Sequence, residues 1–361
     1  MPTPLDDAAD RLRLIRTPGV GPVAFRQLLA RFGTAAAALD ALPDLARRGG
    51  GAPRLPDAAA IAREREAVAR IGARHLFLGE ADYPALLAEL DDAPPVLTAR
   101  GDAALTRAPT VALVGARNAS AASCRYARGL AHDLAARGAT VVSGLARGID
   151  SAAHQGALPA TVAVIAGGID VVYPPENAAL QERVAAEGLL LAEMPPGTEP
   201  RARHFPYRNR IIAGLSLGTV VIEAAPRSGS LITARLAGEA GREVMAVPGH
   251  PGDPRAAGCN GLIREGATLI QGAADVLEQL RPIDARAVRA PASPWDGGPP
   301  EDATDADRRR LSTLLGTVAV PVDELVRQSA LSPAVVQAVL LEWELAGRLE
   351  RHAGGRVSLI D

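Results

Sequence analysis

The sequence predicts an α/β protein, in which a doubly wound, mostly parallel sheet lies between a small helical module and a winged-helix domain. Three observations predict this class. Six short runs of β-branched residues in the middle of the chain are bounded by Gly or Pro, with room for a helix between them. Amphipathic helical patterns fill the first 70 residues, and the last 50 read as helices followed by a hairpin. The length of 361 residues allows two or three domains.

Residues 1–70 are expected to form a helical module. Apolar side chains recur at helical spacing on both sides of a Gly-Val-Gly-Pro turn at residues 19–22, and a further helix is expected over residues 57–71. The turn resembles the helix-hairpin-helix, whose glycines let backbone amides approach a phosphate of DNA. A tight connection between two helices explains it equally well. We interpret the module as SAM-like or helix-hairpin-helix-like.

Residues 71–283 are expected to carry the sheet. Near-continuous apolar strands are buried on both faces, which favours a parallel sheet with helices on both sides. Ligands of such sheets bind outside the carboxyl ends of the strands. The loops with unusual composition follow those ends. The predicted strands are residues 110–115, 140–144, 161–168, 189–194, 219–225 and 243–249.

The C-terminal part is predicted to be a linker, residues 284–306, and a winged-helix domain, residues 307–361. The linker is rich in Pro, Ala, Gly and Asp. In the domain, Ser332 is placed to cap a helix with Pro333 in its first turn, and a hairpin is expected around Gly354 and Gly355. Winged helices often bind duplex DNA, but residues 333–337 at the start of the expected recognition helix include no basic residue. An accessory or protein-binding role is favoured.

The composition excludes several classes of protein. A net charge of −2 excludes a polycation, so contact with nucleic acid requires a local basic patch. All 39 basic residues are Arg, which fits the codon usage of a high-GC genome. Cys124 and Cys259 are too few for a disulfide framework or a four-ligand zinc site. The chain shows neither a signal peptide nor an 18-residue apolar run. A cytoplasmic protein is expected.

The sequence carries no recognisable catalytic constellation. It has no Walker loop, no G-x-S-x-G elbow and no pair of histidines at metal-binding spacing. His204 and His250 are isolated loop histidines. We therefore expect a protein that is not an enzyme and that needs neither a cofactor nor a metal.

The first loop of interest is Gly115-Ala116-Arg117-Asn118, directly after a predicted strand. Ser120 and Ser123 are placed to cap the helix that follows. The loop is not G-x-G-x-x-G, so a dinucleotide would meet the wrong turn, whereas a phosphodiester would meet a helix N-terminus and a guanidinium. A surface arginine in a turn is the alternative.

The second loop lies in residues 143–158. Gly144 and Gly148 permit tight turns on either side of Arg147, which predicts an anion-binding nest. Either Asp150 or Ser151 could cap the next helix, and His154 is interpreted as a histidine on the surface of that helix.

The third stretch, residues 201–216, interleaves arginine with aromatic side chains. Single-stranded nucleic acid requires this combination, because both its backbone charge and its exposed bases must be met. The alternative is that the aromatics are core and that the arginines pair with acids elsewhere. The residues proposed from this stretch are Arg201, Arg203, Phe205, Tyr207, Arg208, Asn209 and Arg210.

The fourth loop, within residues 223–234, joins a strand end to a helix. Ser228, Gly229 and Ser230 could present amides and hydroxyls to a phosphate. Ser230 could equally serve only as a helix cap.

Taken in order, these motifs resemble the DNA-processing protein family DprA (Smf). The matching stretches are Gly-Ala-Arg, Ser-Gly-Leu-Ala-Arg-Gly-Ile-Asp-x-x-Ala-His, Phe-Pro-x-Arg-Asn-Arg-Ile-Ile-Ala-Gly-Leu-Ser and Ser-Gly-Ser-Leu-Ile-Thr-Ala, and the resemblance covers about residues 71–280. It implies an extended Rossmann fold that binds single-stranded DNA without sequence specificity, protects it and helps to load the RecA recombinase during natural transformation.

The same resemblance implies roles for particular residues. Arg117 and the basic residues before Phe-Pro would line the DNA pocket. Some family members have lysine just before Phe-Pro, where this chain offers Arg201 and Arg203. A homodimer is implied through the far end of the sheet, with Leu262, Ile263 and Leu269 at its apolar centre or, alternatively, in ordinary core positions.

An enzyme is the competing interpretation. Residues 143–168 also resemble the nucleotide-binding sheet of nucleoside-monophosphate phosphoribohydrolases, which carry Pro-Gly-Gly-x-Gly-Thr-x-x-Glu. Aligned on Gly229, this chain has Thr233 where the catalytic glutamate would stand. The missing general base favours binding over hydrolysis. Glu223 lies nearby, either as a remnant of such chemistry or as a partner of a pocket arginine.

Overall fold

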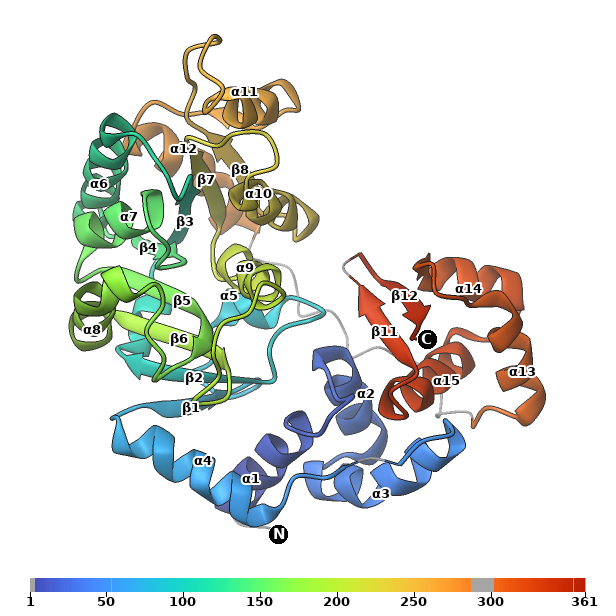
Figure 1. Cartoon of the computed structure of the whole chain (residues 1–361). Coiled ribbons are helices and arrows are strands. Elements are labelled where there is room, and N and C mark those ends of the chain that lie inside the picture. The colour runs from blue at the N-terminus through green and yellow to red at the C-terminus, as the bar shows by residue number, and fades with distance from the viewer. Residues whose placement is uncertain (1–3, 53, 287–301, 353, 361) are drawn as a thin grey trace. The chain divides into compact units, whose positions relative to one another are not determined.

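The computed structural model describes residues 4–52, 54–286, 302–352 and 354–360 (Figure 1). They form two compact units. The larger unit spans residues 64–289, and the smaller one combines the N-terminal residues up to 63 with those from 290 onward. Most of the predicted linker, residues 287–301, lies outside the described residues.

The larger unit is built on a nine-stranded sheet. Its strands are β1 (Arg74–Phe77), β2 (Val96–Gly101), β3 (Thr110–Gly115), β4 (Thr140–Ser143), β5 (Thr161–Gly168), β6 (Leu189–Met194), β7 (Gly218–Ile222), β8 (Glu243–Ala246) and β9 (Thr268–Leu269). They lie in the order β1-β2-β6-β5-β4-β3-β7-β8-β9. Pairing is parallel from β6 to β9, whereas β1 and β2 are antiparallel. The predicted mostly parallel sheet is confirmed.

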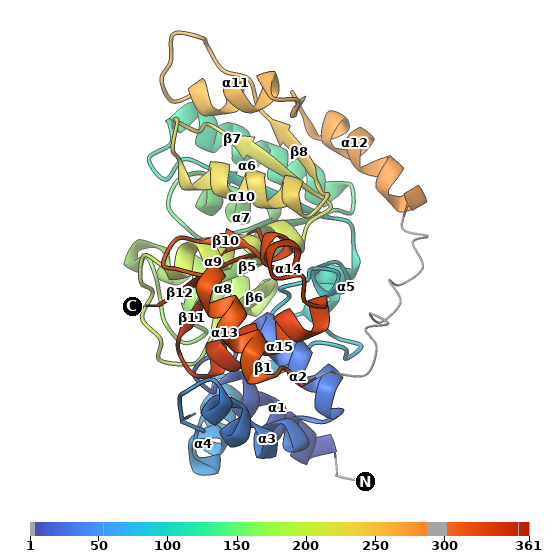
Figure 2. The ribbon, with the colours of Figure 1, turned by 90° about the vertical axis from the view of Figure 1, so that its right-hand side faces the viewer.

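Helices cover both faces of this sheet. Alternate residues of β3 enter different hydrophobic clusters, Val111 and Leu113 on one face and Ala112 and Val114 on the other. Figure 1 shows α6, α7 and α8 on one side and α9 and α10 on the other, and Figure 2 shows α11 and α12 beyond β8. The helices are α4 (Ala58–Arg70), α5 (Ala85–Ala88), α6 (Ala121–Ala136), α7 (Ile149–Ala157), α8 (Ala178–Glu187), α9 (His204–Gly214), α10 (Gly229–Glu239), α11 (Ala257–Arg264) and α12 (Ala273–Arg286), with 3-10 turns η1 (Ala103–Arg107) and η2 (Pro175–Asn177).

All six predicted strands are present, and the structure adds three that the sequence did not reveal. β1 and β2 form an antiparallel edge, and β9 pairs through only two residues. After Val96 and Leu97, β2 continues as Thr-Ala-Arg-Gly, so it lacks the continuous apolar run from which the six strands were predicted. The strand predicted over residues 219–225 is shorter than expected, because β7 ends at Ile222. The residues that follow Ile222 therefore form a loop at the carboxyl edge of the sheet and are not part of the strand.

The smaller unit joins helices from both ends of the chain. Its N-terminal helices are α1 (Pro4–Ile15), α2 (Pro22–Phe32) and α3 (Ala35–Arg48). Its C-terminal part has the winged-helix order that the sequence predicts, with a sheet ordered β10-β12-β11. The Ser332 hydroxyl accepts the backbone N–H of Val335 at 3.3 Å, as expected of a helix cap. The C-terminal elements are α13 (Asp305–Leu314), β10 (Val320–Pro321), α14 (Val322–Ser329), α15 (Pro333–Leu345), β11 (Leu349–His352) and β12 (Arg356–Leu359).

No helix within the described ranges is both long and apolar enough to cross a membrane.

Candidate nucleic-acid interface

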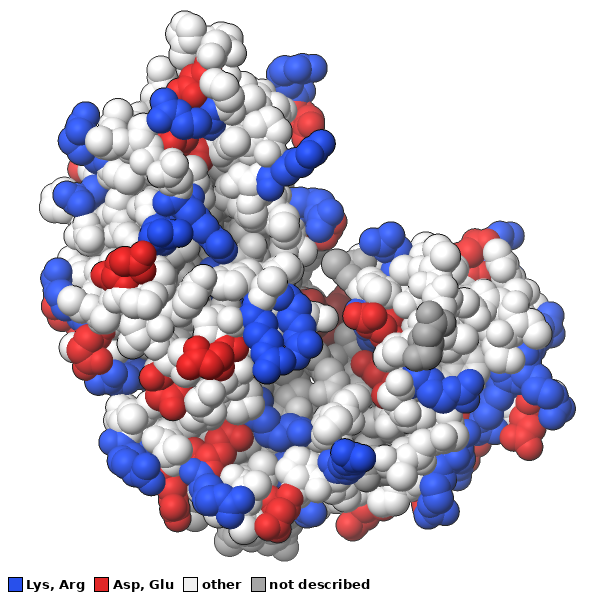
Figure 3. Space-filling model, viewed as in Figure 1, with Lys and Arg blue, Asp and Glu red and all other residues white. Residues whose placement is uncertain are grey.

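A cleft of about 600 Å³ opens at the carboxyl edge of the sheet. It is bounded by the loops after β3, β4 and β7 and by the first turns of α9. A smaller cavity of about 50 Å³ adjoins it, between the loops after β4 and β5. The cleft lies within the size range of about 300–1,000 Å³ that small-molecule sites occupy, which suits one nucleotide. Figure 3 shows basic side chains gathered in two groups on the face of this unit near β4 and α9.

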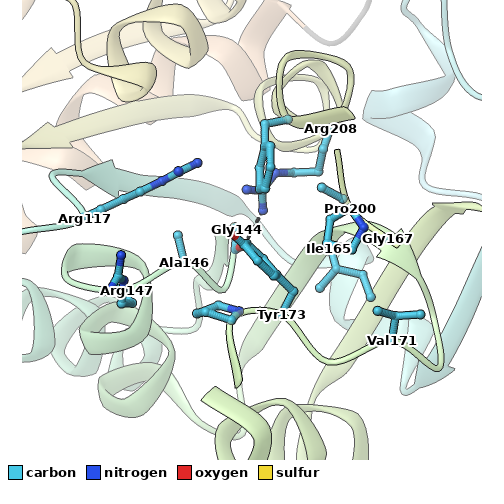
Figure 4. Close-up of a pocket in the computed structure, with 13 residues that line it drawn as sticks. Arg117, Gly144, Ala146, Arg147, Ile165, Gly167, Val171, Tyr173, Pro200 and Arg208 are labelled. Atoms are coloured by element: carbon cyan, nitrogen blue, oxygen red, sulfur yellow. Dashed lines mark hydrogen bonds between the residues drawn. The ribbon is translucent and has the colours of Figure 1, made fainter. Parts of the chain in front are cut away.

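An aromatic and guanidinium stack stands where the two cavities meet. The Arg117 guanidinium lies 4.9 Å from the centroid of the Phe205 ring. The rings of Phe205 and Tyr173 are 5.7 Å apart and inclined at 54°. Figure 4 shows Arg117 extending from the loop after β3 into this space. Arg117 is exposed and forms no salt bridge with a carboxylate among the described residues, so both its charge and the Phe205 face can meet a ligand.

Arg208 has a different role from the one the sequence indicates. Its side chain is only 5% exposed, and its guanidinium donates to the backbone carbonyls of Gly144 and Val164, the latter at 2.5 Å. Burial lowers the pKa of Arg208 to about 10, so it stays charged at neutral pH. Arg208, on α9, therefore ties the loop at residues 144–148, here called the glycine loop, to β5. Only the small exposed part of its side chain lines the cleft.

Two glycines let the loops approach one another. A β-carbon on Gly144 would lie 2.2 Å from an Arg208 nitrogen, so any side chain there would displace the guanidinium. Gly148 has a φ of +75°, and a β-carbon on it would lie 2.3 Å from the Ala116 carbonyl oxygen. Gly148 thus joins the glycine loop to the Arg117 loop. Close packing therefore explains why glycine stands at both positions. The predicted anion-binding nest remains a hypothesis.

Asp150 and His154 are buried beneath the glycine loop, so the expectations for both were wrong. Gly148 takes the cap position of α7, and Asp150 accepts the Ala146 N–H at 3.4 Å. Burial raises the pKa of the Asp150 carboxyl, against the opposing effect of the Arg208 charge. His154 is fully buried, accepts the Leu145 N–H on Nε2 and faces the Thr161 hydroxyl at 2.8 Å. Burial lowers the pKa of His154 to about 3.

We expect His154 to make the protein less stable as the pH falls below about 6.5, by up to about 1.4 kcal/mol per pH unit. The unfolded chain then protonates His154, whereas the folded protein keeps it neutral until its pKa of about 3 is reached. Urea titrations from neutral to acidic pH should show a weaker pH dependence for His154→Gln than for wild type. The exposed His132, changed to Gln, is the control; equal slopes for all three proteins would contradict a neutral, buried His154.

The N-terminus of α10 faces the cleft. Ser228 is its cap, since its hydroxyl accepts the Ser230 N–H at 3.4 Å, and the two hydroxyls lie 2.8 Å apart. Gly229 is exposed, and a β-carbon on it would meet nothing within 4 Å. The Asn209 amide reaches the Gly229 carbonyl at 3.4 Å. A helix start beside open space is suited to an anion.

Glu223 supports the Arg117 loop. Its carboxylate accepts the Ser120 N–H at 2.9 Å and the Ser120 hydroxyl at 2.6 Å. Burial would raise the pKa of Glu223, but hydrogen bonds from Ser120 and Ser123 hold it below its usual value. A carboxylate whose pKa is lowered in this way, and whose two oxygens are both bound by Ser120, is a poor general base. The backbone of Glu223 has a φ of +52°. Two other non-glycine residues at this edge of the sheet also have a positive φ, Leu145 at +54° and Arg227 at +67°. Such strained positions cluster at functional sites.

The structure brings together most of the residues that the sequence singled out, but not all of them. Arg210 turns away from the cleft: it is buried, pairs with Glu193 at 2.5 Å and donates to the Asp92 carbonyl at 2.6 Å. The predicted alternative, pairing with an acid elsewhere, applies to this arginine. The predicted residues that do line the cavities are Gly115, Arg117, Gly144, Arg147, Phe205, Arg208, Asn209, Ser228, Gly229 and Ser230.

The remaining predicted residues lie outside the lining of the cavities. Arg201 and Arg203 are exposed just before α9, and Tyr207 is half exposed on it. Arg147 does line the smaller cavity, but its guanidinium lies 3.5 Å from a carboxylate oxygen of Glu176 and is therefore not free of an acidic neighbour. The other residues outside the lining are Asn118, Ser120 and Gly148.

The three residues proposed for a dimer centre differ in exposure. Leu262 and Ile263 of α11 are partly buried against the core of the larger unit. Leu269, in the edge strand β9, is 45% exposed. Of the three, only Leu269 offers a substantial apolar surface.

Sequence reasoning missed the loop after β5. Tyr173 is 45% exposed, lines the smaller cavity and contacts Phe205. Val171 and Pro174 of the same loop complete that wall. The available signal was the Gly-Gly-Ile-Asp-Val-Val-Tyr-Pro run at a strand's carboxyl end, where an aromatic side chain is placed for ligand contact.

Models of known families match three successive segments of the chain. They are a DprA-like N-terminal HHH domain over residues 5–67, DNA recombination-mediator protein A over residues 74–281, and a DprA winged helix domain over residues 295–355.

Individual proteins agree with these matches. The DNA processing protein DprA of Bacillus subtilis (strain 168) is 42% identical over 232 residues, which make up 63% of this chain and 76% of that protein. DNA processing protein A from Streptococcus pneumoniae has a similar structure, with a TM-score of 0.59 and 38% identity over 68% of this chain and 82% of that one. The protein from Helicobacter pylori, whose structure concerns a single-stranded DNA binding mode, has a TM-score of 0.52 and 30% identity over 59% and 97% of the two chains.

Proposed function

Because the chain belongs to the DprA and Smf family of DNA recombination-mediator proteins, we propose that it binds single-stranded DNA in the cleft at the carboxyl edge of its sheet. The observation that carries this proposal is the stack of Arg117 on Phe205, exposed where the two cavities meet. A guanidinium and an aromatic face side by side match the phosphate and the base of one nucleotide. The Helicobacter pylori relative, whose structure concerns single-stranded DNA binding, supports the same conclusion.

The backbone of the DNA would cross the start of α10. The Gly229 amide and the hydroxyls of Ser228 and Ser230 offer an anion site, and Arg117 lies across the same cleft. Arg201 and Arg203, exposed just before α9, would meet neighbouring phosphates. Bases would stack on Phe205, with Tyr173 at the side of the stack. This arrangement contacts phosphates and base faces without a groove that reads base edges, so little sequence preference is expected.

We infer that the protein binds and does not hydrolyse nucleotides. Glu223, which could have served an enzyme, is engaged by Ser120. Thr233, at the place of the catalytic glutamate in the phosphoribohydrolases, is buried and carries no basic group.

We propose, further, a cytoplasmic homodimer that protects single-stranded DNA and helps to load the RecA recombinase during DNA uptake, as the family resemblance implies. The edge strand β9 supports the dimer, because it ends the sheet of the described residues and Leu269 is exposed there. Sedimentation of wild type and Leu269→Glu tests it: the variant should be monomeric, and an unchanged dimer would place the interface elsewhere.

We expect single-stranded binding to weaken steeply with salt. Each phosphate neutralised by an arginine releases counterions, so the slope of log K against log salt should be about −0.7 per contact. Fluorescence anisotropy with a labelled oligonucleotide at several salt concentrations measures the slope, and the matched duplex measures the preference. A slope near zero, or equal affinity for the duplex, would contradict a binding mode that depends on phosphates and open bases.

A further inference from the structure

The helix-hairpin-helix-like turn and the winged-helix domain share one hydrophobic core in the smaller unit. Leu341 and Leu345 of α15 are buried in the same cluster as Leu14, Phe25 and Leu42 of the N-terminal helices. Figures 1 and 2 both show α15 beside these helices. The two segments, far apart in the sequence, are therefore parts of one folded body.

Three glycines allow the backbones to touch. A β-carbon on Gly19 would lie 2.6 Å from the Glu344 carbonyl oxygen, and one on Gly49 would lie 2.1 Å from the Glu342 carbonyl oxygen. A β-carbon on Gly51 would lie 2.7 Å from the Cα of Ala346. Side chains at these places would push the end of α15 away. Gly19, Gly49 and Gly51 are thus accounted for by a protein contact.

Polar contacts fix the same surface. Gln27 donates to Gln337 at 2.8 Å, and Arg348 donates to the Gly49 carbonyl at 3.2 Å. Asp302 lies against Arg48 at 3.3 Å and against Arg31. These contacts lie around the apolar centre and define one orientation of α15 on the N-terminal helices.

The contact covers the parts of both domains that would otherwise face DNA. A helix-hairpin-helix turn binds phosphate through open backbone amides, but here a carboxylate oxygen of Glu344 lies 3.6 Å from the position of a β-carbon on Gly21. Glu344 is buried and held by Arg351 at 2.8 Å. A carboxylate in this place repels phosphate. The recognition helix α15 buries nine of its 13 residues and contains no arginine, so it offers little to a DNA groove.

We propose that the Gly-Val-Gly-Pro turn and α15 are binding partners of one another, so that the N-terminal module and the winged-helix domain act as one rigid protein unit in which neither contacts DNA. The larger unit is then left to bind DNA by itself. This proposal does not depend on which ligand occupies the cleft.

A covalent cross-link across the contact tests the proposal in the full-length protein. The side chains of Gln27 and Gln337 meet at 2.8 Å, so cysteines at these two positions lie within reach of a short bis-maleimide cross-linker. In Gln27→Cys/Gln337→Cys we expect the linked peptides to appear by mass spectrometry, with unchanged affinity of the cross-linked protein for single-stranded and duplex DNA. The two single variants control for linkage to Cys124 or Cys259. A failure to cross-link these two positions in folded protein, or a loss of DNA binding on cross-linking, would overturn the proposal.

A second pair of variants tests the contact without a cross-link. Gly49→Ala should lower the unfolding temperature of the smaller unit, since its methyl group meets the Glu342 backbone. Gly316→Ala in the same unit places its methyl group in open space and should leave that temperature unchanged. Equal unfolding temperatures for the two variants would contradict the contact, and the cleft in the larger unit would be unaffected by either result.

Discussion

Phe205→Ala weakens single-stranded DNA binding by between about fivefold and about 140-fold, if the cleft is the DNA site. Stacking of one base on an aromatic ring contributes about 1–3 kcal/mol, and a tenfold change in affinity corresponds to about 1.4 kcal/mol. Phe205 is the ring at the junction of the two cavities, in contact with both Arg117 and Tyr173. Removing it takes away the base platform and the support of the guanidinium together. Anisotropy titrations with a labelled oligonucleotide measure the loss.

Tyr207→Ala is the matched control for this prediction. Tyr207 lies on the same helix, is 50% exposed and does not line either cavity. The sequence offered both aromatics as stacking candidates, whereas the geometry separates them. If Tyr207→Ala weakens binding as much as Phe205→Ala, the DNA follows the outside of α9 and the cleft is not the site.

Arg208→Met should destabilise the larger unit by about 3–5 kcal/mol, the range observed when one member of a buried charged group is removed. The two carbonyls of Gly144 and Val164 lose their guanidinium donor, and the buried Asp150 loses its compensating charge. Chemical denaturation followed by circular dichroism measures the change in the free energy of unfolding. Methionine keeps most of the side-chain volume, so the effect reports the lost hydrogen bonds and charge.

Arg147→Met provides the comparison for Arg208→Met. Arg147 also lines a cavity, but it is exposed, and its contact with Glu176 is long at 3.5 Å. Exposed pairs of this kind contribute little, at most about 1 kcal/mol. If Arg208→Met is as stable as Arg147→Met but binds DNA poorly, Arg208 contacts phosphate and does not organise the glycine loop.

The fold could be predicted from the sequence because its main signals are local. Continuous apolar runs with glycine at their ends indicated buried parallel strands, and the loops that follow parallel strands necessarily gather at one edge of their sheet. The antiparallel edge was missed because β2 loses its apolar pattern after Leu97, and a two-residue strand such as β9 leaves no pattern at all.

The roles of individual arginines could not be predicted, since they depend on distant partners. Arg208 and Arg210 are two positions apart on α9, yet one is held by carbonyls of β5 and the glycine loop and the other by Glu193. No spacing rule distinguishes a buried guanidinium from an exposed one when the acceptors are backbone atoms of other segments. For the same reason Tyr173 was not found, since its contact with Phe205 joins the loop after β5 to α9. The cavities, in contrast, contain Arg117, Phe205 and Ser228, which the motifs indicated.

The most direct test of whether the Arg117 loop binds single-stranded DNA is a dissociation constant. It is measured with a labelled oligonucleotide for wild type, Arg117→Ala and Arg137→Ala. The two variants lose the same charge, but Arg137 follows the far end of α6, which has 16 residues and is about 24 Å long. We expect severalfold weaker binding for Arg117→Ala alone, in a protein that unfolds at the same denaturant concentration as wild type. Equal dissociation constants for all three proteins would contradict this role of Arg117 and exclude the cleft as the DNA site.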